Sequence, residues 1–171
     1  MDICVEAILY EQKSVLIQML ELYQYDFSEF SDDDINEYGY FGYAHIDDYW
    51  NEEGRHPFFI RVNGKLAGLV LVRSCCEHNT LPTPHCIAEF FVMKKYRQKG
   101  VGRAVAMKIF DMIHGGWEVS QWVNNLPAQN FWRKVVVHCG TIKSQVDRVV
   151  WLGKAFLEGT HDKKEVMLYI G

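Results

Sequence analysis

The sequence lacks an excess of positive charge, because its 18 Lys and Arg residues are outnumbered by 22 Asp and Glu residues. Without an overall basic field, the chain is not expected to hold nucleic acid. It also lacks any apolar run near the roughly 18 residues that a spanning helix needs, so we expect no membrane partner. The first residues, MDICVEAILYEQK, contain neither a basic region nor a small-residue cleavage site and do not predict a signal peptide.

Cysteine is scarce: there are five, an odd number, and Cys75 and Cys76 are adjacent. This usage is typical of reduced thiols in a cytoplasmic protein and not of a disulfide framework. Together with His78, His85 and Cys86 these residues could be read as a metal cluster, but their spacing matches no zinc pattern. Neighbouring strand residues also point to opposite faces. We therefore predict free thiols, no metal and a cytoplasmic location.

The chain has 171 residues, 49% of them apolar and 23% charged, as is usual for one globular domain, here residues 1–171. Asn63-Gly64 separates two apolar runs and predicts a β-hairpin. Periodicity and turn residues then give the remaining elements. Strands are expected at 3–8, 57–62, 66–73, 86–93, 117–123 and 165–170, with 149–153 a further candidate; helices at 11–25, 101–113 and 127–136; and a loop at 77–84. This order predicts an α/β fold with a mixed sheet.

Residues 26–53 contain ten acidic residues and no Lys or Arg, together with eight aromatic residues. An acidic linker would be poor in aromatic residues, so this segment is expected to fold back onto the domain. Two interpretations stay open. The segment is either a solubilising acidic surface or a wall that attracts a cationic ligand by charge and by aromatic faces.

Gly100 and Gly102 lie between an expected strand and an expected helix. Two glycines at this spacing allow a tight turn that exposes consecutive N–H groups, and the helix N-terminus adds positive potential. The surrounding basic residues are Lys94, Lys95, Arg97, Lys99 and Arg103. The turn matches neither a Walker loop nor a dinucleotide fingerprint, whose third glycine position is Val105 here. The pattern predicts a phosphate site or, as the alternative, a basic turn without a ligand.

The run F-F-V-x-x-x-Y-R-x-x-G-x-G, Phe90 to Gly102, resembles the acetyl-CoA signature of the GNAT N-acetyltransferase superfamily. Asn125 to Trp132 is similar to its second signature, N-x-x-A-x-x-hydrophobic-aromatic. The resemblance implies a single-domain GNAT-like fold with a central mixed, mostly antiparallel sheet flanked by helices, and a splayed strand at the acetyl-CoA site. The signatures cover residues 86–113 and 125–132, whereas residues 138–171 fit only loosely.

By this resemblance, the turn would bind the pyrophosphate of acetyl-CoA, and the end of the preceding strand would pair with its pantetheine arm. The implied cofactor-binding residues are Phe90, Phe91, Val92, Arg97, Gln98, Lys99, Gly100, Val101, Gly102, Arg103, Asn125 and Trp132. Trp132 stands where many members have a tyrosine that protonates the leaving thiolate. That role is therefore vacant, and we expect the indole to pack against the cofactor sulfur.

Transfer to an amine requires a base, because an alkyl amine is mostly protonated at neutral pH. Glu89 is the candidate, as the ionisable residue in an otherwise apolar strand. The alternative is a strand-edge glutamate that faces solvent or pairs with a lysine. Asp47, Asp48 and Glu52 are reserve candidates for the base.

The resemblance implies direct, acetyl-CoA-dependent acetylation of a primary amine. The acidic segment favours a cationic small-molecule acceptor, contacted by Tyr43, Asp47, Asp48 and Trp50. The alternatives are acetylation of a protein N-terminus or lysine, a non-catalytic acyl-CoA-binding domain, and a partner-binding module with an empty turn. Tail strands often pair between subunits in this superfamily, so the resemblance also allows a homodimer.

Overall fold

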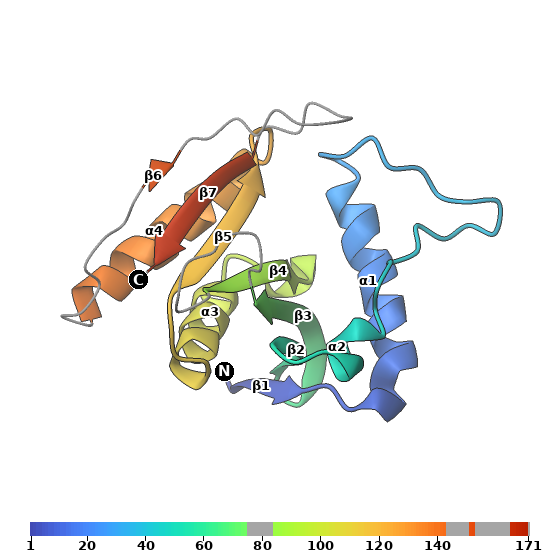
Figure 1. The fold of residues 1–171 in the computed structure, drawn as a ribbon, viewed down its shortest axis with the longest axis horizontal. Coiled ribbons are helices and arrows are strands. Elements are labelled where there is room, and N and C mark those ends of the chain that lie inside the picture. Colours follow the sequence, from blue (N-terminus) through green and yellow to red (C-terminus); the bar gives the residue numbers. More distant parts are fainter. Residues whose placement is uncertain (75–83, 143–150, 153–164, 171) are drawn as a thin grey trace. The chain divides into compact units, whose positions relative to one another are not determined.

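The computed structural model describes residues 1–74, 84–142, 151–152 and 165–170, with side chains described up to Val137 (Figure 1). Its strands are β1 (Ile3–Ala7), β2 (Arg55–Val62), β3 (Lys65–Ser74), β4 (His85–Val92), β5 (Trp117–Trp122), β6 (Trp151–Leu152) and β7 (Glu165–Ile170). Its helices are α1 (Lys13–Phe27), α2 (Asp48–Asn51), α3 (Val101–Met112) and α4 (Leu126–Ile142), with 3₁₀ turns η1 (Tyr10–Gln12) and η2 (Lys94–Tyr96).

The strands form a sheet in the order β1-β2-β3-β4-β5-β7-β6. The β1–β2, β2–β3, β5–β7 and β6–β7 pairs are antiparallel, whereas β4 and β5 are parallel. The predicted α/β class, with a mixed and mostly antiparallel sheet flanked by helices, is confirmed. The elements α2 and η2 were not predicted, and most of the expected 77–84 loop lies outside the described residues.

Contacts divide the chain into two compact units, which we describe separately: residues 1–73 with 88–105, and residues 74–87 with 106–171. In the first unit, β2 and β3 form the predicted hairpin. Asn63 and Gly64 both have positive φ angles, 49° and 75°, as a type I′ turn requires. Apolar side chains of α1 pack against those of the hairpin in one core, and its central residues are Leu16, Leu20, Phe59, Leu69 and Leu71.

The backbones of β3 and β4 approach closely at Gly68 in the first unit. A Cβ atom added there would lie 2.0 Å from the carbonyl oxygen of Phe91. Next to this contact, the Met93 N–H donates to the Ala67 carbonyl at 2.8 Å. Only glycine leaves room for this approach, which fixes the C-terminal half of β4 against the core.

In the second unit, β5 pairs with the start of β4 and, along its whole length, with β7. The parallel register joins only His85 with Trp117 and Cys86 with Glu118 among the described residues, although both strands continue beyond these pairs. The splayed strand at the acetyl-CoA site that the family resemblance implies stays a prediction. None of the helices in the described part of the chain is long and apolar enough to cross a bilayer.

The prediction of free thiols is wrong at one position, because Cys86 is disulfide-bonded in the structure. Spacing along the chain does not determine which sulfurs meet, since a disulfide requires only that two Cα atoms come within about 7 Å in the fold. Cys4 is free and exposed. Cys75, Cys76 and His78 lie outside the described residues.

The close approach at Gly68 yields a stability prediction. Gly68→Ala should lower the free energy of unfolding by about 1–3 kcal/mol, because the backbone of β4 must move to admit a methyl group. Thermal unfolding measures this as a fall in Tm of several degrees. Lys65→Ala, at an exposed position of the same strand, is the control and should change Tm little. An unchanged Tm for Gly68→Ala would contradict the prediction.

Candidate functional site

A partly buried carboxylate, that of Glu89 on β4, lies at the centre of a hydrogen-bonded cluster in the first unit. The Tyr43 hydroxyl donates to Glu89 Oε1 at 2.9 Å, and the Tyr23 hydroxyl of α1 hydrogen-bonds the same carboxylate. Phe91, two residues after Glu89 and so on the same face of the strand, packs against Tyr23 with ring centroids 5.8 Å apart. The structure therefore places Glu89 among tyrosines and not at a solvent-facing strand edge.

Two opposing effects set the acidity of Glu89. Burial raises the pKa of its carboxyl group, while the hydrogen bonds from Tyr23 and Tyr43 and the positive charge of Arg73 partly offset that rise. Burial also raises the pKa of the Tyr23 and Tyr43 hydroxyls, and the nearby Glu89 charge adds to this rise. The two phenols therefore stay protonated and act as hydrogen-bond donors to the carboxylate.

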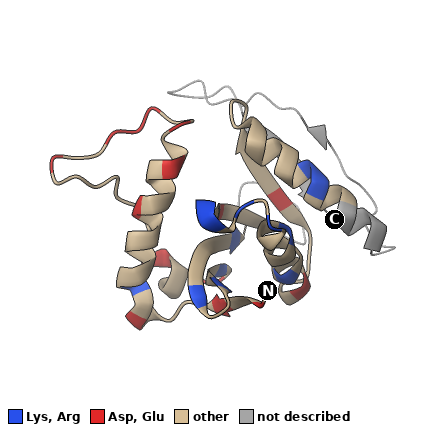
Figure 2. Ribbon diagram, turned by 180° about the vertical axis from the view of Figure 1, so that it is seen from behind, with Lys and Arg blue, Asp and Glu red and all other residues tan. Residues whose placement is uncertain are grey.

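Only the end of the acidic segment folds back onto the first unit, where Tyr43, Tyr49 and Trp50 pack in the core. Residues 32–40 are exposed, in a loop after α1 that carries acidic residues (Figure 2). The Glu21 carboxylate of α1 accepts the backbone N–H groups of Phe41 and Gly42, at 2.9 and 3.0 Å. Further along, the Trp50 indole donates to the Ile8 carbonyl at 3.0 Å. These contacts hold the end of the segment against α1 and against Ile8, which follows β1, and they bring Tyr43 to Glu89.

The predicted substrate residues separate into two groups. Tyr43 meets Glu89, whereas the acids pair with cations of the same unit: Asp47 with Lys13 at 2.5 Å, and Asp48 with Arg55 at 3.5 Å. The other reserve base, Glu52, also pairs with Arg55, at 2.6 Å. Arg55 in turn lies 5.5 Å from the ring centroid of Tyr49, which hydrogen-bonds Tyr43. Glu89 alone among the four candidate bases lies within the tyrosine cluster.

The glycine turn has the backbone that its sequence predicts. Gln98 and Gly100 have φ angles of 59° and 79°, and α3 begins at Val101. The Ala104 N–H donates to the Gly100 carbonyl at 3.1 Å, so the N–H groups of the preceding first turn are directed out of the helix end. A Cβ on Gly100 would meet no atom within 4 Å. The turn thus presents backbone donors toward open space, the arrangement that suits a phosphate.

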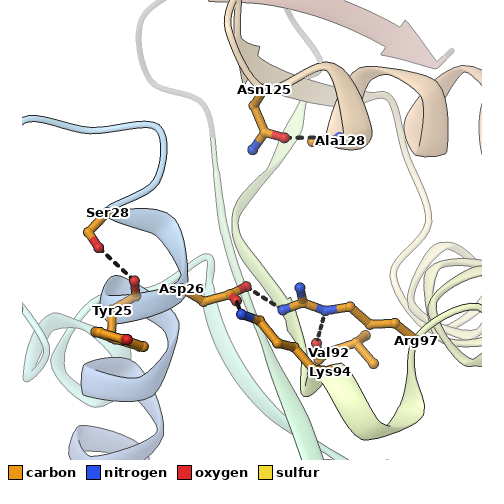
Figure 3. A network of polar contacts seen from close by, with 8 residues as sticks. All are labelled: Tyr25, Asp26, Ser28, Val92, Lys94, Arg97, Asn125 and Ala128. Atoms are coloured by element: carbon orange, nitrogen blue, oxygen red, sulfur yellow. Dashed lines mark hydrogen bonds and ion pairs between the residues drawn. The ribbon is translucent and has the colours of Figure 1, made fainter.

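Charged side chains link this turn to the end of α1 (Figure 3). Asp26 forms ion pairs with Arg97 and with Lys94, the latter at 3.2 Å. Arg97 also donates from Nε to the Val92 carbonyl at 2.6 Å and lies over the Phe91 ring. The Arg97 side chain therefore braces the strand end, and its implied contact with the cofactor stays a prediction.

In the second unit, Asn125 caps helix α4. Its side-chain oxygen accepts the Ala128 N–H at 3.0 Å (Figure 3), which explains why asparagine and alanine occur three residues apart in the second signature. Asn125 and Trp132 are both buried, with 9% and 4% of their surfaces exposed. The Trp132 indole packs edge-on against Phe131, with centroids 4.9 Å apart. The cofactor contacts implied for both residues stay predictions.

The sequence patterns do not mark Glu21, Tyr23, Asp26 or Tyr49 as participants. Glu21 and Tyr23 lie within the expected helix at 11–25, and Asp26 and Tyr49 lie within the acidic, aromatic segment at 26–53. A polar aromatic residue at a buried helix position is a signal that could have marked Tyr23, because a buried hydroxyl needs a partner. No local signal pairs Asp26 with Arg97, which is 71 residues away.

Comparison with known proteins agrees with this geometry. The model of the acetyltransferase (GNAT) family matches residues 16–136. A GNAT-family acetyltransferase structure from Streptococcus agalactiae aligns at 13% identity and TM-score 0.69, covering 98% of this chain and 94% of its own. PaiA N-acetyltransferase from Thermoplasma acidophilum, in complex with coenzyme A, aligns at 10% identity and TM-score 0.65, covering 99% of both chains.

An aminoglycoside acetyltransferase from an uncultured soil metagenomic sample, in complex with sisomicin, aligns at 17% identity and TM-score 0.59, covering 89% of this chain and 97% of its own. At these identities the structural likeness shows the fold alone. Among curated proteins, no sequence matches this chain. The family model, in contrast, covers more than half of the chain and includes β4, the glycine turn and the Asn125 cap. The chain belongs to the GNAT acetyltransferase family.

Proposed function

We propose that this protein is an acetyl-CoA-dependent N-acetyltransferase that moves the acetyl group directly to the primary amine of a cationic small molecule. The observation that carries the proposal is the Glu89 carboxylate, held by tyrosine hydroxyls on the strand that leads into the glycine turn. A base and an anion-binding turn on one short stretch of chain are what direct acyl transfer from a phosphate-bearing thioester requires.

Two parts of the first unit would bind acetyl-CoA. The outward N–H groups of the Gly100–Arg103 turn would hold the pyrophosphate of acetyl-CoA, and the end of β4 would pair with its pantetheine arm. Acetyl-CoA supplies an activated acyl group as a thioester. Backbone N–H groups of β4 would polarise its carbonyl, where negative charge develops during the transfer.

Glu89 would remove the proton that the amine loses as its nitrogen bonds to the acetyl carbon and the carbon–sulfur bond breaks. The pKa of its carboxyl group is raised by burial, so it is a stronger base than an exposed glutamate. The leaving thiolate has a pKa near that of a free thiol and departs without strong acid assistance. This is consistent with a tryptophan, Trp132, at the position of the usual proton donor.

The acidic segment supports a cationic acceptor. An open hollow of about 690 Å³ in the first unit is lined by Tyr25, Ser28, Ser31, Asp32, Asp33, Asp34, Ile35 and Phe41. Unlike Asp47 and Asp48, the three consecutive aspartates form none of the ion pairs found among the described residues. Their combined charge would attract a second positive charge on an acceptor whose reacting amine meets Glu89.

The cofactor turn is tested by thermal shift with coenzyme A. At 100 times its dissociation constant, coenzyme A should stabilise the wild-type protein by about 2.7 kcal/mol, a shift of several degrees in Tm. Gly102→Glu should abolish this shift, because a carboxylate in the first turn of α3 repels the pyrophosphate. Gly102→Ala adds no charge and is the matched control that should retain most of it. An equal shift in wild type and Gly102→Glu would refute the assignment.

The base is tested by Glu89→Gln, which keeps the side chain's size and removes its basicity. With acetyl-CoA and 1,6-diaminohexane, thiol release should slow about 10²–10⁴-fold. In the wild type the rate should fall as the pH drops through the Glu89 pKa, which lies above 4.5, because protonation removes the base. Glu11→Gln, at an exposed position, is the control. Stabilisation by coenzyme A without consumption of acetyl-CoA by any amine would instead favour a non-catalytic binding domain.

The acceptor class is tested with a matched pair, 1,6-diaminohexane and hexylamine, which differ by one distant positive charge. At low salt we expect roughly a tenfold higher kcat/KM for the diamine, with the difference shrinking at 0.5 M salt as the charges are screened. Replacing Asp32, Asp33 and Asp34 together by Asn should remove the preference and leave hexylamine turnover unchanged. Equal turnover of both amines at low salt would count against a cationic acceptor.

A further inference from the structure

We propose that Tyr23 and Tyr43 are positioning residues that hold the Glu89 carboxylate for proton removal, and that Glu21 fixes the loop that delivers Tyr43. The inference rests on the proposed role of Glu89 as the base. Glu21 and Tyr23 of α1 and Tyr43 of the acidic segment would thus act together on the Glu89 carboxylate.

The two hydroxyls reach Glu89 from separate parts of the chain. Tyr23 extends from α1, and Tyr43 extends from the loop between α1 and α2, with its hydroxyl 2.9 Å from Oε1. A carboxylate offers about four acceptor positions on its two oxygens. Two phenol donors therefore fix the orientation of the Glu89 side chain and leave acceptor positions for the proton of an incoming amine.

Glu21 holds the loop immediately before Tyr43. Its two carboxylate oxygens accept the N–H groups of Phe41 and Gly42 separately, at 2.9 and 3.0 Å, so the loop is held at two adjacent points. Because Glu21 and Tyr23 are two residues apart on α1, one helix contacts both the loop and the base. A shift of the loop would withdraw the Tyr43 hydroxyl from Glu89.

A second row of residues supports Tyr43. Tyr49 of α2 hydrogen-bonds Tyr43, and the Arg55 guanidinium of β2 lies over the Tyr49 ring at 5.5 Å. The titratable or charged groups that face Glu89 or its partners are three tyrosines, from α1, the loop and α2, together with Arg73 of β3, Arg55 of β2 and Asp26 of α1. Since the Tyr23 and Tyr43 hydroxyls stay protonated, removing either one takes a donor from Glu89 without adding a charge.

The experiment measures the Glu89 titration directly. In protein labelled with ¹³C at the glutamate carboxyl carbons, Tyr43→Phe should raise the Glu89 pKa by about one unit, because a donor to the ionised form is lost. Glu89→Gln identifies the signal. Tyr38→Phe, in the same segment with 77% of its surface exposed, is the matched control and should leave the titration unchanged. An unaltered Glu89 pKa in Tyr43→Phe overturns the inference.

A kinetic experiment with acetyl-CoA and 1,6-diaminohexane separates positioning from the base assignment. In Tyr43→Phe and Tyr23→Phe, the acidic pKa in the pH profile of kcat/KM should rise by about one unit, as in the NMR titration. At low pH this is about a tenfold loss of kcat/KM, while KM for acetyl-CoA should be unchanged. Glu21→Gln should shift this pKa in the same direction. Adding Tyr43→Phe to Glu89→Gln should cost no further activity.

The two proposals fail in distinguishable ways. If Glu89→Gln keeps full activity, the base assignment falls, and the positioning role falls with it. If Glu89→Gln is inactive while the pH profile of kcat/KM is unchanged in Tyr43→Phe, Glu89 remains assigned as the base, and only the positioning role of Tyr43 is overturned. If Tyr43→Phe lowers Tm but leaves the pH profile of kcat/KM unchanged, Tyr43 has only a structural role.

Discussion

The removal of the Glu89 carboxylate from water constrains the structure around it. A partly buried carboxylate is costly unless hydrogen-bond donors replace the lost water, and here two tyrosine hydroxyls and the nearby charge of Arg73 do so. Those donors come from α1, the following loop and, indirectly, α2, so each of these elements must hold its place for the charge to be tolerated. The same environment strengthens the carboxylate as a base.

This requirement explains why the end of the acidic segment is folded against the first unit, whereas residues 32–40 are exposed. Tyr43, Tyr49 and Trp50 enter the core, and the acidic residues near them meet cations: Asp47 pairs with Lys13 and Asp48 with Arg55. Glu21 adds a carboxylate that binds the loop backbone. Asp32 to Asp34 are left beside an open hollow, where their charge is available to a ligand.

The geometry of the glycine turn, in contrast, depends on backbone conformation and little on side chains. Positive φ angles at Gln98 and Gly100 and the start of α3 at Val101 direct N–H groups outward. The arginine of the motif is turned toward Asp26 and the Val92 carbonyl, where it braces the end of β4. The two cofactor signatures therefore include residues that shape the chain, Arg97 and Asn125, as well as residues that would contact a ligand.

The sequence alone determined the hairpin at Asn63-Gly64, the strand-turn-helix junction at Gly100 and the family, because these depend on local backbone preferences and short spacings. It also singled out Glu89, whose charge is unusual in an apolar strand. Only the tertiary structure decided which groups meet this carboxylate, since Tyr23 and Tyr43 lie 66 and 46 residues away along the chain. The Cys86 disulfide and the Asp26–Arg97 pair were likewise decided by the fold. Such contacts follow from packing and charge between distant segments, which no local pattern encodes.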